Sequence, residues 1–377
     1  MREFRIQNNE AGQRFDKYLK KLLSEAPNSF VYKMLRKKNI TLNDKKADSS
    51  EKLAAGDTVK LFLSDETFDK FAGKDKISAR YESLKHLGQT LNGSESTLRD
   101  SEGTLRDSES TLKNSENTLR DSESTLRAPE STLRILGDGA MRSQSALPVL
   151  YEDADILIVN KPAGMLSQKA KPSDISANEY ILHYLIEQGE LDEEMMQTFL
   201  PSVCNRLDRN TSGILIAGKT LKGLQEMSAA LKERTAQKYY RCLVKGELGE
   251  CDYIRGWLKK DETTNKVTIY KDAANVQDAQ PIETEYRPIH VKGGYTELEV
   301  HLITGRSHQI RAHLASIGHP IIGDPKYGDR KVNAYFKKEC EITSQMLHAY
   351  RIVLDDRGEI VAPCGEKFSR VRKKLGF

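Results

Sequence analysis

The first 63 residues follow a hydrophobic pattern that predicts two helices and a strand. In two stretches the apolar residues recur three and four positions apart, as on one face of a helix: Phe15, Tyr18, Leu19 and Leu22, then Val31, Met34 and Leu35. Val59, Leu61 and Leu63 instead alternate with other residues, which is typical of a strand. These elements are enough for a small α/β unit, which we assign to residues 1–75.

Residues 64–93 show no hydrophobic periodicity, and six seven-residue repeats follow over residues 94–135, beginning with SESTLRD. A coiled coil needs two apolar positions per heptad, whereas each repeat offers one leucine. Each repeat also places an acid four residues before a base, but such a pair adds only about 0.2–0.5 kcal/mol to a helix. Ser, Thr, Asp and Pro129 oppose a helix. We therefore predict a linker over residues 76–146 whose repeats form a disordered or marginally helical tether.

From residue 147 to residue 377 the pattern predicts a second, larger unit. Apolar runs such as DILIV, residues 155–159, alternate with helical stretches. Near its end, Thr296, Leu298, Val300 and Leu302 mark one face of a strand. A turn and a helix follow, with Ser307 as the expected N-cap and Gly318 as the end. Strands with helices between them predict an α+β fold with a mixed sheet.

Composition and charge restrict the possible partners. Hydrophobic residues make up 38% of the chain and its net charge is +4, so a polyanion would be bound by a local basic patch. Residues 1–63 provide one, with 14 Lys and Arg against 8 Asp and Glu. The five cysteines are scattered without a C-x-x-C pair, which predicts reduced thiols and no zinc site. Because no stretch of about 18 apolar residues occurs, we expect a soluble, cytoplasmic protein that does not bind membranes.

The stretch NRLDRNTSGILIAGKT, residues 205–220, is compatible with two kinds of site. Its second half matches the phosphate-loop pattern G-x-x-x-x-G-K-[ST]. A phosphate loop needs loop-forming residues between its glycines, but Ile214, Leu215, Ile216 and Ala217 are typical of a buried strand. We therefore predict a strand over residues 213–218 and an N-cap at Thr220. A nucleotide triphosphatase dependent on Lys219 remains the disfavoured alternative.

The first half of this stretch places Asp208 in a turn between Arg206 and Arg209. Neighbouring arginines favour the charged carboxylate, which suits a nucleophile better than a general acid. A turn aspartate beside two exposed arginines explains R-L-D-R equally well when the motif is considered alone.

Three segments together resemble a known enzyme family. NRLDRNTSG, K-Y-Y at residues 238–240 and LITGRSHQIRAHLASIGHPIIGDPKYG at residues 302–328 are similar, in order and spacing, to the RluA-type RNA pseudouridine synthases. ADILIVNKPAGMLSQ and MLHAYRIVL resemble the opening and late strands of that family, so the resemblance covers most of residues 147–377. The family usually has histidine before R-L-D. Here it is Asn205, which cannot exchange a proton at neutral pH.

The resemblance implies a pseudouridine synthase fold with a mixed, largely antiparallel central sheet. It implies that Asp208 is the nucleophile in an isomerisation that detaches uracil from ribose and rejoins it through carbon 5, without a cofactor. Arg311 would form an ion pair with Asp208, and Tyr240 would stack on the target base. Arg206 would fill the gap left by the flipped uridine, and Arg306 would bind phosphate or shape the site.

The first unit resembles the RNA-binding domain named after ribosomal protein S-four along nearly its whole length. Lys33, Arg36 and Lys37 form a basic face on its second helix, which implies contact with structured RNA, although an ordinary solvated face has the same composition. Since this domain accompanies the branches that act on ribosomal RNA, large-subunit rRNA is the predicted partner, transfer RNA is the second candidate, and we expect a monomer.

Two further hypotheses remain open from the sequence. A catalytically silent RNA-binding or ribosome-assembly protein would share the basic unit, but the intact aspartate, tyrosine and arginine disfavour it. A metal site is disfavoured because none of four neighbouring histidines are four residues apart on one helical face: His301, His308, His313 and His319.

Overall fold

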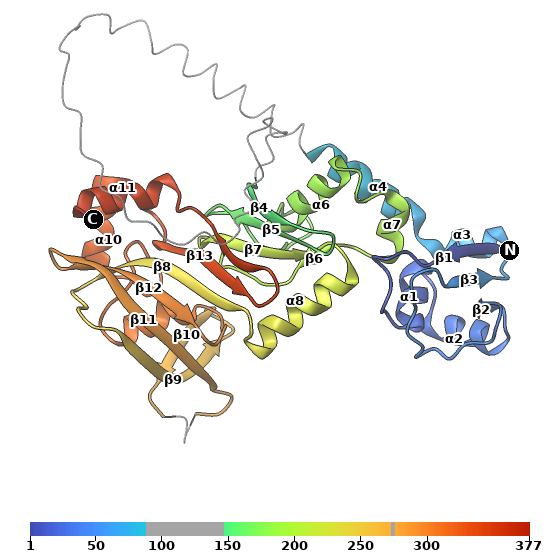
Figure 1. The fold of residues 1–377 in the computed structure, drawn as a ribbon, viewed down its shortest axis with the longest axis horizontal. Helices are drawn as coiled ribbons and strands as arrows, with labels where there is room; N and C mark the ends of the chain where they lie inside the picture. The colour runs from blue at the N-terminus through green and yellow to red at the C-terminus, as the bar shows by residue number, and fades with distance from the viewer. Residues whose placement is uncertain (88–146, 273–275) are drawn as a thin grey trace, which may run out of the picture. The chain divides into compact units, whose positions relative to one another are not determined.

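A computed structural model describes residues 1–87, 147–272 and 276–377, and its largest element is an 11-stranded sheet (Figure 1). Nine strands follow one another across this sheet: β10 (Lys266–Tyr270), β9 (Asp252–Asp261), β11 (Gln280–Lys292), β12 (Tyr295–Leu302), β8 (Gln237–Lys245), β13 (Leu347–Leu354), β7 (Ser212–Gly218), β5 (Ile156–Lys161) and β4 (Val149–Glu152). β14 (Gly358–Val361) pairs with β13, and β6 (Ser202–Val203) pairs with β7. Only the β13–β7 pair is parallel among these described strands. This confirms the prediction of a mixed, largely antiparallel sheet.

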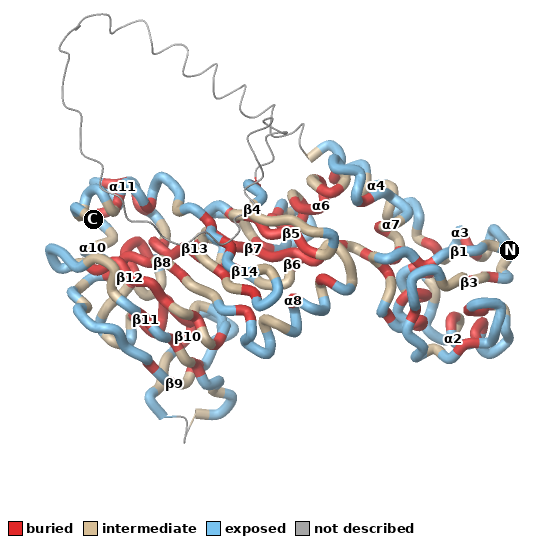
Figure 2. The backbone as a smooth tube through the Cα atoms, viewed as in Figure 1, coloured by how far each residue is buried: buried red, intermediate tan, exposed pale blue. Residues whose placement is uncertain are grey.

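Six helices accompany this sheet in the described chain: α6 (Ala177–Glu187), α7 (Glu193–Thr198), α8 (Leu221–Glu233), α9 (Gln309–Ser316), α10 (Arg330–Cys340) and α11 (Glu366–Leu375). Thr220 is the N-cap of α8, as predicted, and its hydroxyl accepts a hydrogen bond from Gly223 N at 3.0 Å. The longest buried runs lie in β5, β7 and β12, and Figure 2 shows buried residues in red along the central strands of the sheet. No helix among the described residues is long and apolar enough to cross a membrane.

The first residues form a three-stranded sheet in the order β1 (Arg2–Arg5), β3 (Thr58–Leu61) and β2 (Ile40–Leu42). Two helices, α1 (Phe15–Leu22) and α2 (Asn28–Arg36), bury the apolar faces that the sequence predicted. This small core supports the α/β assignment, and the proposed division of the chain at residues 75 and 147 stays a prediction.

Residues 65–85 are helical, although the sequence showed no periodicity there. They form α3 (Asp65–Ala72), capped by Ser64, and α4 (Lys74–Lys85). Within these two helices only Phe68, Ala72 and Leu84 are buried, which is too sparse a pattern to be recognised in the sequence. Leu84 joins a hydrophobic cluster with residues of α6, so α4 packs against the larger sheet domain. The heptad repeats at residues 94–135 lie outside the described residues.

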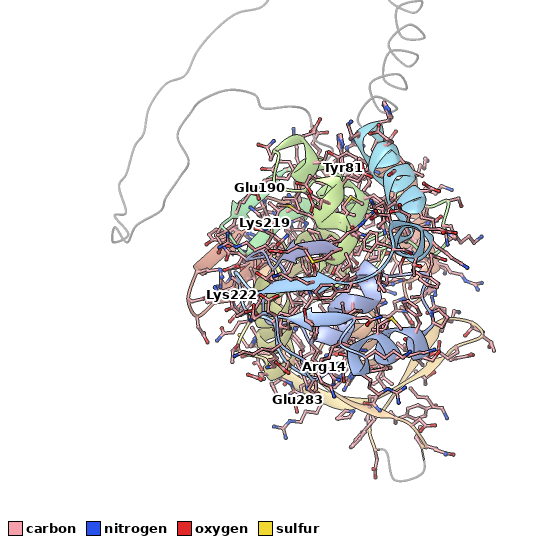
Figure 3. The ribbon with its side chains drawn as sticks, turned by 90° about the vertical axis from the view of Figure 1, so that its right-hand side faces the viewer. Arg14, Tyr81, Glu190, Lys219, Lys222 and Glu283 are labelled. Carbon is pink, nitrogen blue, oxygen red and sulfur yellow. The ribbon has the colours of Figure 1, made fainter. Side chains whose placement is uncertain are left out.

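The phosphate-loop pattern is a strand, as predicted. Gly213, with φ of +112°, lies so close to β13 that an added Cβ would be 2.1 Å from Ala349 O. The Lys219 ammonium lies 2.8 Å from a Glu152 carboxylate oxygen and 2.5 Å from one of Glu190 (Figure 3). Glycine is therefore required for close packing of strands, and the lysine is neutralised by carboxylates, so this segment does not form a phosphate cradle.

Candidate active site

The turn that carries Asp208 is fastened to β7 on one side. Cys204 N donates to Ile216 O at 2.7 Å, and the Asn205 side chain then continues this pairing. Asn205 Oδ1 accepts from Ile216 N at 2.8 Å, and its Nδ2 donates to Ile214 O at 3.3 Å. The amide therefore acts like one more peptide unit of the strand. This gives Asn205 a structural role that needs no proton transfer.

Two buried groups hold the other side of the turn. Ser167 Oγ both donates to Leu207 O and accepts from Leu207 N, each at 3.0 Å, just before Asp208. The Lys161 ammonium is fully buried and donates to three backbone carbonyls, including Arg209 O at 3.1 Å, just after Asp208. Burial lowers the pKa of Lys161 to about 8, against the opposing charge of Asp208. These contacts hold the backbone on both sides of Asp208 and so fix where its side chain begins.

The Asp208 carboxylate forms an ion pair with Arg311 of α9, as the resemblance implied. Arg311 Nη1 donates to Asp208 Oδ2 at 2.8 Å. The same guanidinium donates through Nε and Nη2 to both oxygens of Asp324, at 2.7 Å and 2.9 Å. Arg206 and Arg209, the neighbours of Asp208 in the sequence, form no ion pair with it. The counter-ion therefore comes from a helix about 100 residues away in the chain.

In the triad Asp208–Arg311–Asp324, the two carboxylates stabilise the charged form of the buried guanidinium between them. Burial disfavours the charged form of Arg311, but the hydrogen bonds and charge of Asp324 and the charge of Asp208 outweigh it and raise the pKa of Arg311. Burial likewise opposes ionisation of Asp324, but its hydrogen bonds with Arg311 keep the pKa of Asp324 below the usual value. Asp324, which is fully buried, also accepts from Lys326 N at 2.8 Å and Tyr327 N at 3.1 Å. It fixes the guanidinium that holds Asp208.

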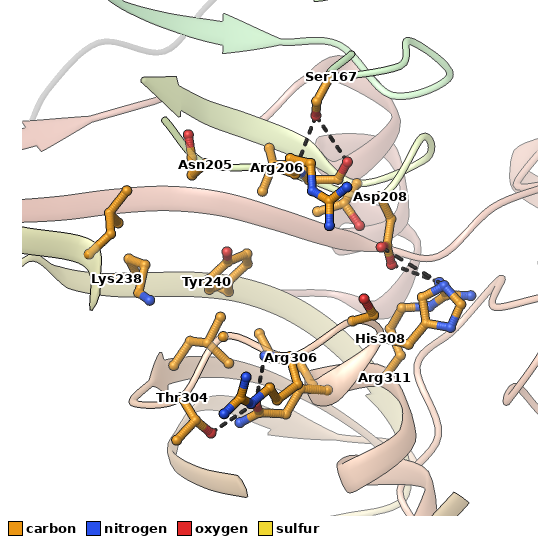
Figure 4. A pocket seen from close by; sticks show the side chains of 18 of the residues that line it. Ser167, Asn205, Arg206, Asp208, Lys238, Tyr240, Thr304, Arg306, His308 and Arg311 are labelled. Atoms are coloured by element: carbon orange, nitrogen blue, oxygen red, sulfur yellow. Dashed lines mark hydrogen bonds and ion pairs between the residues drawn. The ribbon is translucent and has the colours of Figure 1, made fainter. Parts of the chain in front are cut away.

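A pocket of about 960 Å³ opens at Asp208 (Figure 4). Tyr240 lines it from β8, and burial, with the charge of Asp208, raises the pKa of the Tyr240 hydroxyl, so this group is protonated at neutral pH. Asp208 is the single carboxylate among the lining residues, against eight lysine and arginine side chains. Arg206 and Arg306, both exposed, are among these cations. Such a pocket suits a polyanion whose reacting group meets one carboxylate.

The structure brings together five of the sequence-predicted residues, namely Asp208, Tyr240, Arg311, Arg206 and Arg306, around this pocket. The other three, Lys33, Arg36 and Lys37, are exposed at the end of α2 and do not line it.

Four functional candidates were not recognised in the sequence: Lys161, Lys238, His308 and Asp324. Lys238, in β8, lines the pocket without an ion pair to any described residue. Burial and the charge of Arg234 lower its pKa. The K-x-Y spacing to Tyr240 was the available signal for Lys238, because residues two apart in a strand share a face. Lys161, His308 and Asp324 also lie within the stretches that resemble the family, but their partners become visible only in three dimensions.

His308 replaces the expected N-cap, Ser307. It precedes α9 in a left-handed conformation with φ of 55°, and its ring caps no helix N–H. The turn is closed instead by Gln309, whose Oε1 accepts from Arg306 N at 3.0 Å. Within the described residues, no group of three His, Cys, Asp or Glu side chains could hold a metal ion.

The fold and the site define a class of enzyme, and comparisons with known proteins agree on it. A solved structure titled Human RNA Pseudouridylate Synthase Domain Containing 4 superposes with a TM-score of 0.50 at 18% identity, covering 61% of this chain and 93% of that one. This likeness establishes a pseudouridine synthase fold.

The sequence comparisons identify the family. The family model described as RNA pseudouridylate synthase matches residues 155–316. Ribosomal large subunit pseudouridine synthase C of Vibrio vulnificus is 28% identical, covering 98% of this chain and 95% of its own. Ribosomal large subunit pseudouridine synthase D of Nitrosomonas europaea is 31% identical over 55% of this chain and 58% of its own. Residues 155–316 therefore belong to the RNA pseudouridylate synthase family, and the relatives named above are pseudouridine synthases of the large ribosomal subunit.

Proposed function

We propose that this protein converts specific uridines of large-subunit ribosomal RNA to pseudouridine, with Asp208 as the nucleophile. The observation that carries the proposal is the Asp208 carboxylate, held by Arg311 as the one anionic group of a basic pocket. The printed names of the Vibrio and Nitrosomonas relatives support ribosomal RNA as the substrate class. We infer a monomer that acts in the cytoplasm.

The reaction rearranges one nucleotide without an external reactant. The bond between uracil N1 and ribose C1′ breaks, a bond between C5 and C1′ forms, and the proton that leaves C5 is balanced by one gained at N1. Asp208 acts as a nucleophile in its deprotonated form, which the Arg311 guanidinium stabilises. Tyr240 stacks on the flipped base, and Arg206 occupies the place that the base leaves in the RNA.

The first unit supplies affinity for structured RNA in this proposal. Lys33, Arg36 and Lys37 are exposed, and among the described residues no carboxylate forms an ion pair with them. Free cations of this kind are available for backbone phosphates. We propose that residues 1–75 form an S-four-like domain that binds the substrate through this face.

The test compares pseudouridine maps of total RNA from a strain lacking the protein with maps after complementation. The wild-type gene should restore one or a few sites in large-subunit rRNA, and Asp208→Asn should restore none while still binding RNA. Asp278→Asn is the matched control, because Asp278 is an exposed turn residue outside the pocket with φ of 63°, a conformation that Asn tolerates.

Three outcomes would each redirect the proposal. Restored sites confined to transfer RNA would replace the substrate. An unchanged map in the deletion strain, together with RNA binding by the purified protein, would favour the silent RNA-binding hypothesis. Full activity of Asp208→Asn would remove Asp208 from the reaction.

A further inference from the structure

His308 lines the pocket beside Asp208 but has no part in the mechanism described so far. Its side chain is 10% exposed, and its Nε2 lies 3.9 Å from Asp208 Oδ1. Figure 4 shows the ring next to the carboxylate and Arg311. The backbone of His308 is left-handed, with φ of 55°. This conformation is unfavourable for most residues with side chains, so the surrounding structure must maintain it and thereby the position of the ring.

The hydrogen bonds of Tyr327 determine which ring nitrogen of His308 carries the proton. Val267 N can only donate, and it donates to the Tyr327 hydroxyl oxygen at 2.8 Å. The hydroxyl proton then has His308 Nδ1, at 2.9 Å, as its acceptor. A neutral imidazole that accepts at Nδ1 carries its proton on Nε2. The N–H group of the neutral ring therefore points to the Asp208 side.

The two oxygens of Asp208 consequently face different partners. Oδ2 accepts from Arg311 at 2.8 Å, whereas Oδ1 is 3.9 Å from the His308 N–H, too far for a direct hydrogen bond. An oxygen atom about 2.8 Å from each can bridge this separation. It would accept from the N–H and donate to the carboxylate, and among the groups of a ribonucleotide a hydroxyl can do both. In an internal RNA nucleotide the phosphodiesters occupy O3′ and O5′, which leaves the ribose 2′-hydroxyl.

We propose that His308 Nε2–H and Asp208 Oδ1 bind the ribose 2′-hydroxyl of the target nucleotide, and that Tyr327 is the positioning residue that fixes the required tautomer of His308. This inference rests on the proposed function. The site holds the sugar beside the Asp208 carboxylate and distinguishes an RNA nucleotide from a deoxynucleotide at the reacting position.

The proposal predicts a dependence on the 2′-hydroxyl that His308 controls. The affinity of the full-length protein is measured for two product RNAs that differ only at the mapped site, pseudouridine in one and 2′-deoxypseudouridine in the other, so that turnover does not intervene. Wild type should bind the hydroxyl-bearing RNA about 3- to 10-fold more tightly, the range of one hydrogen bond. His308→Asn, which suits the left-handed backbone but is too short to reach the site, should bind both equally, and Tyr327→Phe should show an intermediate ratio.

The control is His301→Asn, since His301 lies in β12 and outside the pocket; it should keep the wild-type ratio. If His308→Asn retains the wild-type ratio, the hydroxyl site does not exist. A general structural defect would weaken the binding of both RNAs by the same factor. The ratio of the two affinities would then stay at the wild-type value, and that outcome also contradicts the proposal.

A second measurement does not depend on activity or on a known target. The ¹⁵N and ¹H shifts of labelled histidines in the free protein report the tautomer of His308, assigned by its loss in His308→Asn. The proposal is supported if the wild-type ring carries its proton on Nε2 and if Tyr327→Phe gives a mixture of both tautomers. It is overturned if the wild-type ring carries its proton on Nδ1. Absence of pseudouridine formation by wild type would instead refute the proposed function.

Discussion

Asp324→Asn tests whether the fully buried carboxylate behind Arg311 maintains the active site. Asp324 Oδ1 accepts from Arg311 Nη2, Lys326 N and Tyr327 N, whereas Oδ2 accepts from Arg311 Nε at 2.7 Å. The Asn side chain should place its amide oxygen where Oδ1 was, because three donors point there. Its NH₂ group then faces Arg311 Nε, so that two donors oppose each other. The guanidinium, whose side chain is 5% exposed, then has Asp208 as its one remaining anion.

The expected loss is about 3 kcal/mol in the free energy of unfolding. One hydrogen bond between charged groups accounts for about 1.5–3 kcal/mol, and breaking a buried ion pair by removing one partner costs about 3–5 kcal/mol. We expect about 3 kcal/mol, the upper end of the first range and the lower end of the second, because Asn keeps the three hydrogen bonds that Oδ1 accepts but loses the negative charge. The rate of the chemical step should also fall, since the guanidinium that orients Asp208 is no longer fixed.

Urea unfolding followed by the fluorescence of Trp257 in β9, and single-turnover pseudouridine formation, measure the two effects. Asp329→Asn is the matched control: Asp329 forms a partly exposed ion pair with Lys245 at 2.7 Å and caps α10, and Asn caps a helix as well as Asp. Its loss should stay below about 1 kcal/mol. The reasoning is refuted if Asp324→Asn is no less stable than Asp329→Asn, or if it is less stable yet fully active.

Three further predictions follow from individual contacts. Asn205→His, which introduces the usual family residue, should lower the free energy of unfolding by about 0.5–1.5 kcal/mol in urea melts, because a neutral imidazole cannot replace both hydrogen bonds of the amide; equal stability would contradict it. Lys238→Gln should reduce the slope of log affinity for single-stranded RNA against log salt by about 0.7, one phosphate contact, and Lys245→Gln, on the same strand but outside the pocket, should not. The free energy of unfolding should fall as pH drops below 6.5. Burial lowers the pKa of His313 to about 4, so the unfolded chain takes up the proton first, and the loss attributable to His313 reaches about 3 kcal/mol at pH 4. His313→Gln should flatten this pH dependence, and an unchanged pH profile would contradict the assignment.

The sequence was sufficient where a single segment determines its own structure. The apolar run between Gly213 and Gly218 predicted β7 correctly against a well-known motif, because bulky residues cannot form a phosphate cradle. The short distance between Gly213 and β13 explains why glycine occurs there, but it could not be predicted, since β13 lies more than 130 residues later in the chain.

Pattern reasoning could not identify features that depend on charges from several strands. Glu297 and Glu299 lie between the apolar positions of β12, where alternation alone would expose them, yet they are 2% and 4% exposed. Arg241 of β8 and Arg372 of α11 approach Glu297, while Arg351 of β13 approaches Glu299. The arginines allow the carboxylates to be buried, and their positions depend on the order of strands in the sheet.

The sharing of one guanidinium between two carboxylates explains how Asp208, the proposed nucleophile, can be both anchored and accessible. Asp324 takes the bidentate contact and is fully buried, so it can receive no ligand. Asp208 receives one N–H from Arg311 and is 27% exposed, which leaves Oδ1 directed to the pocket. Had Arg311 been bidentate to Asp208, both oxygens would be engaged and the carboxylate would be a weaker nucleophile. Asp324 therefore occupies the Nε and Nη2 groups of Arg311, which leaves Nη1 for Asp208. Because Arg311 binds only Oδ2 of Asp208, Oδ1 is left without a direct hydrogen bond from it.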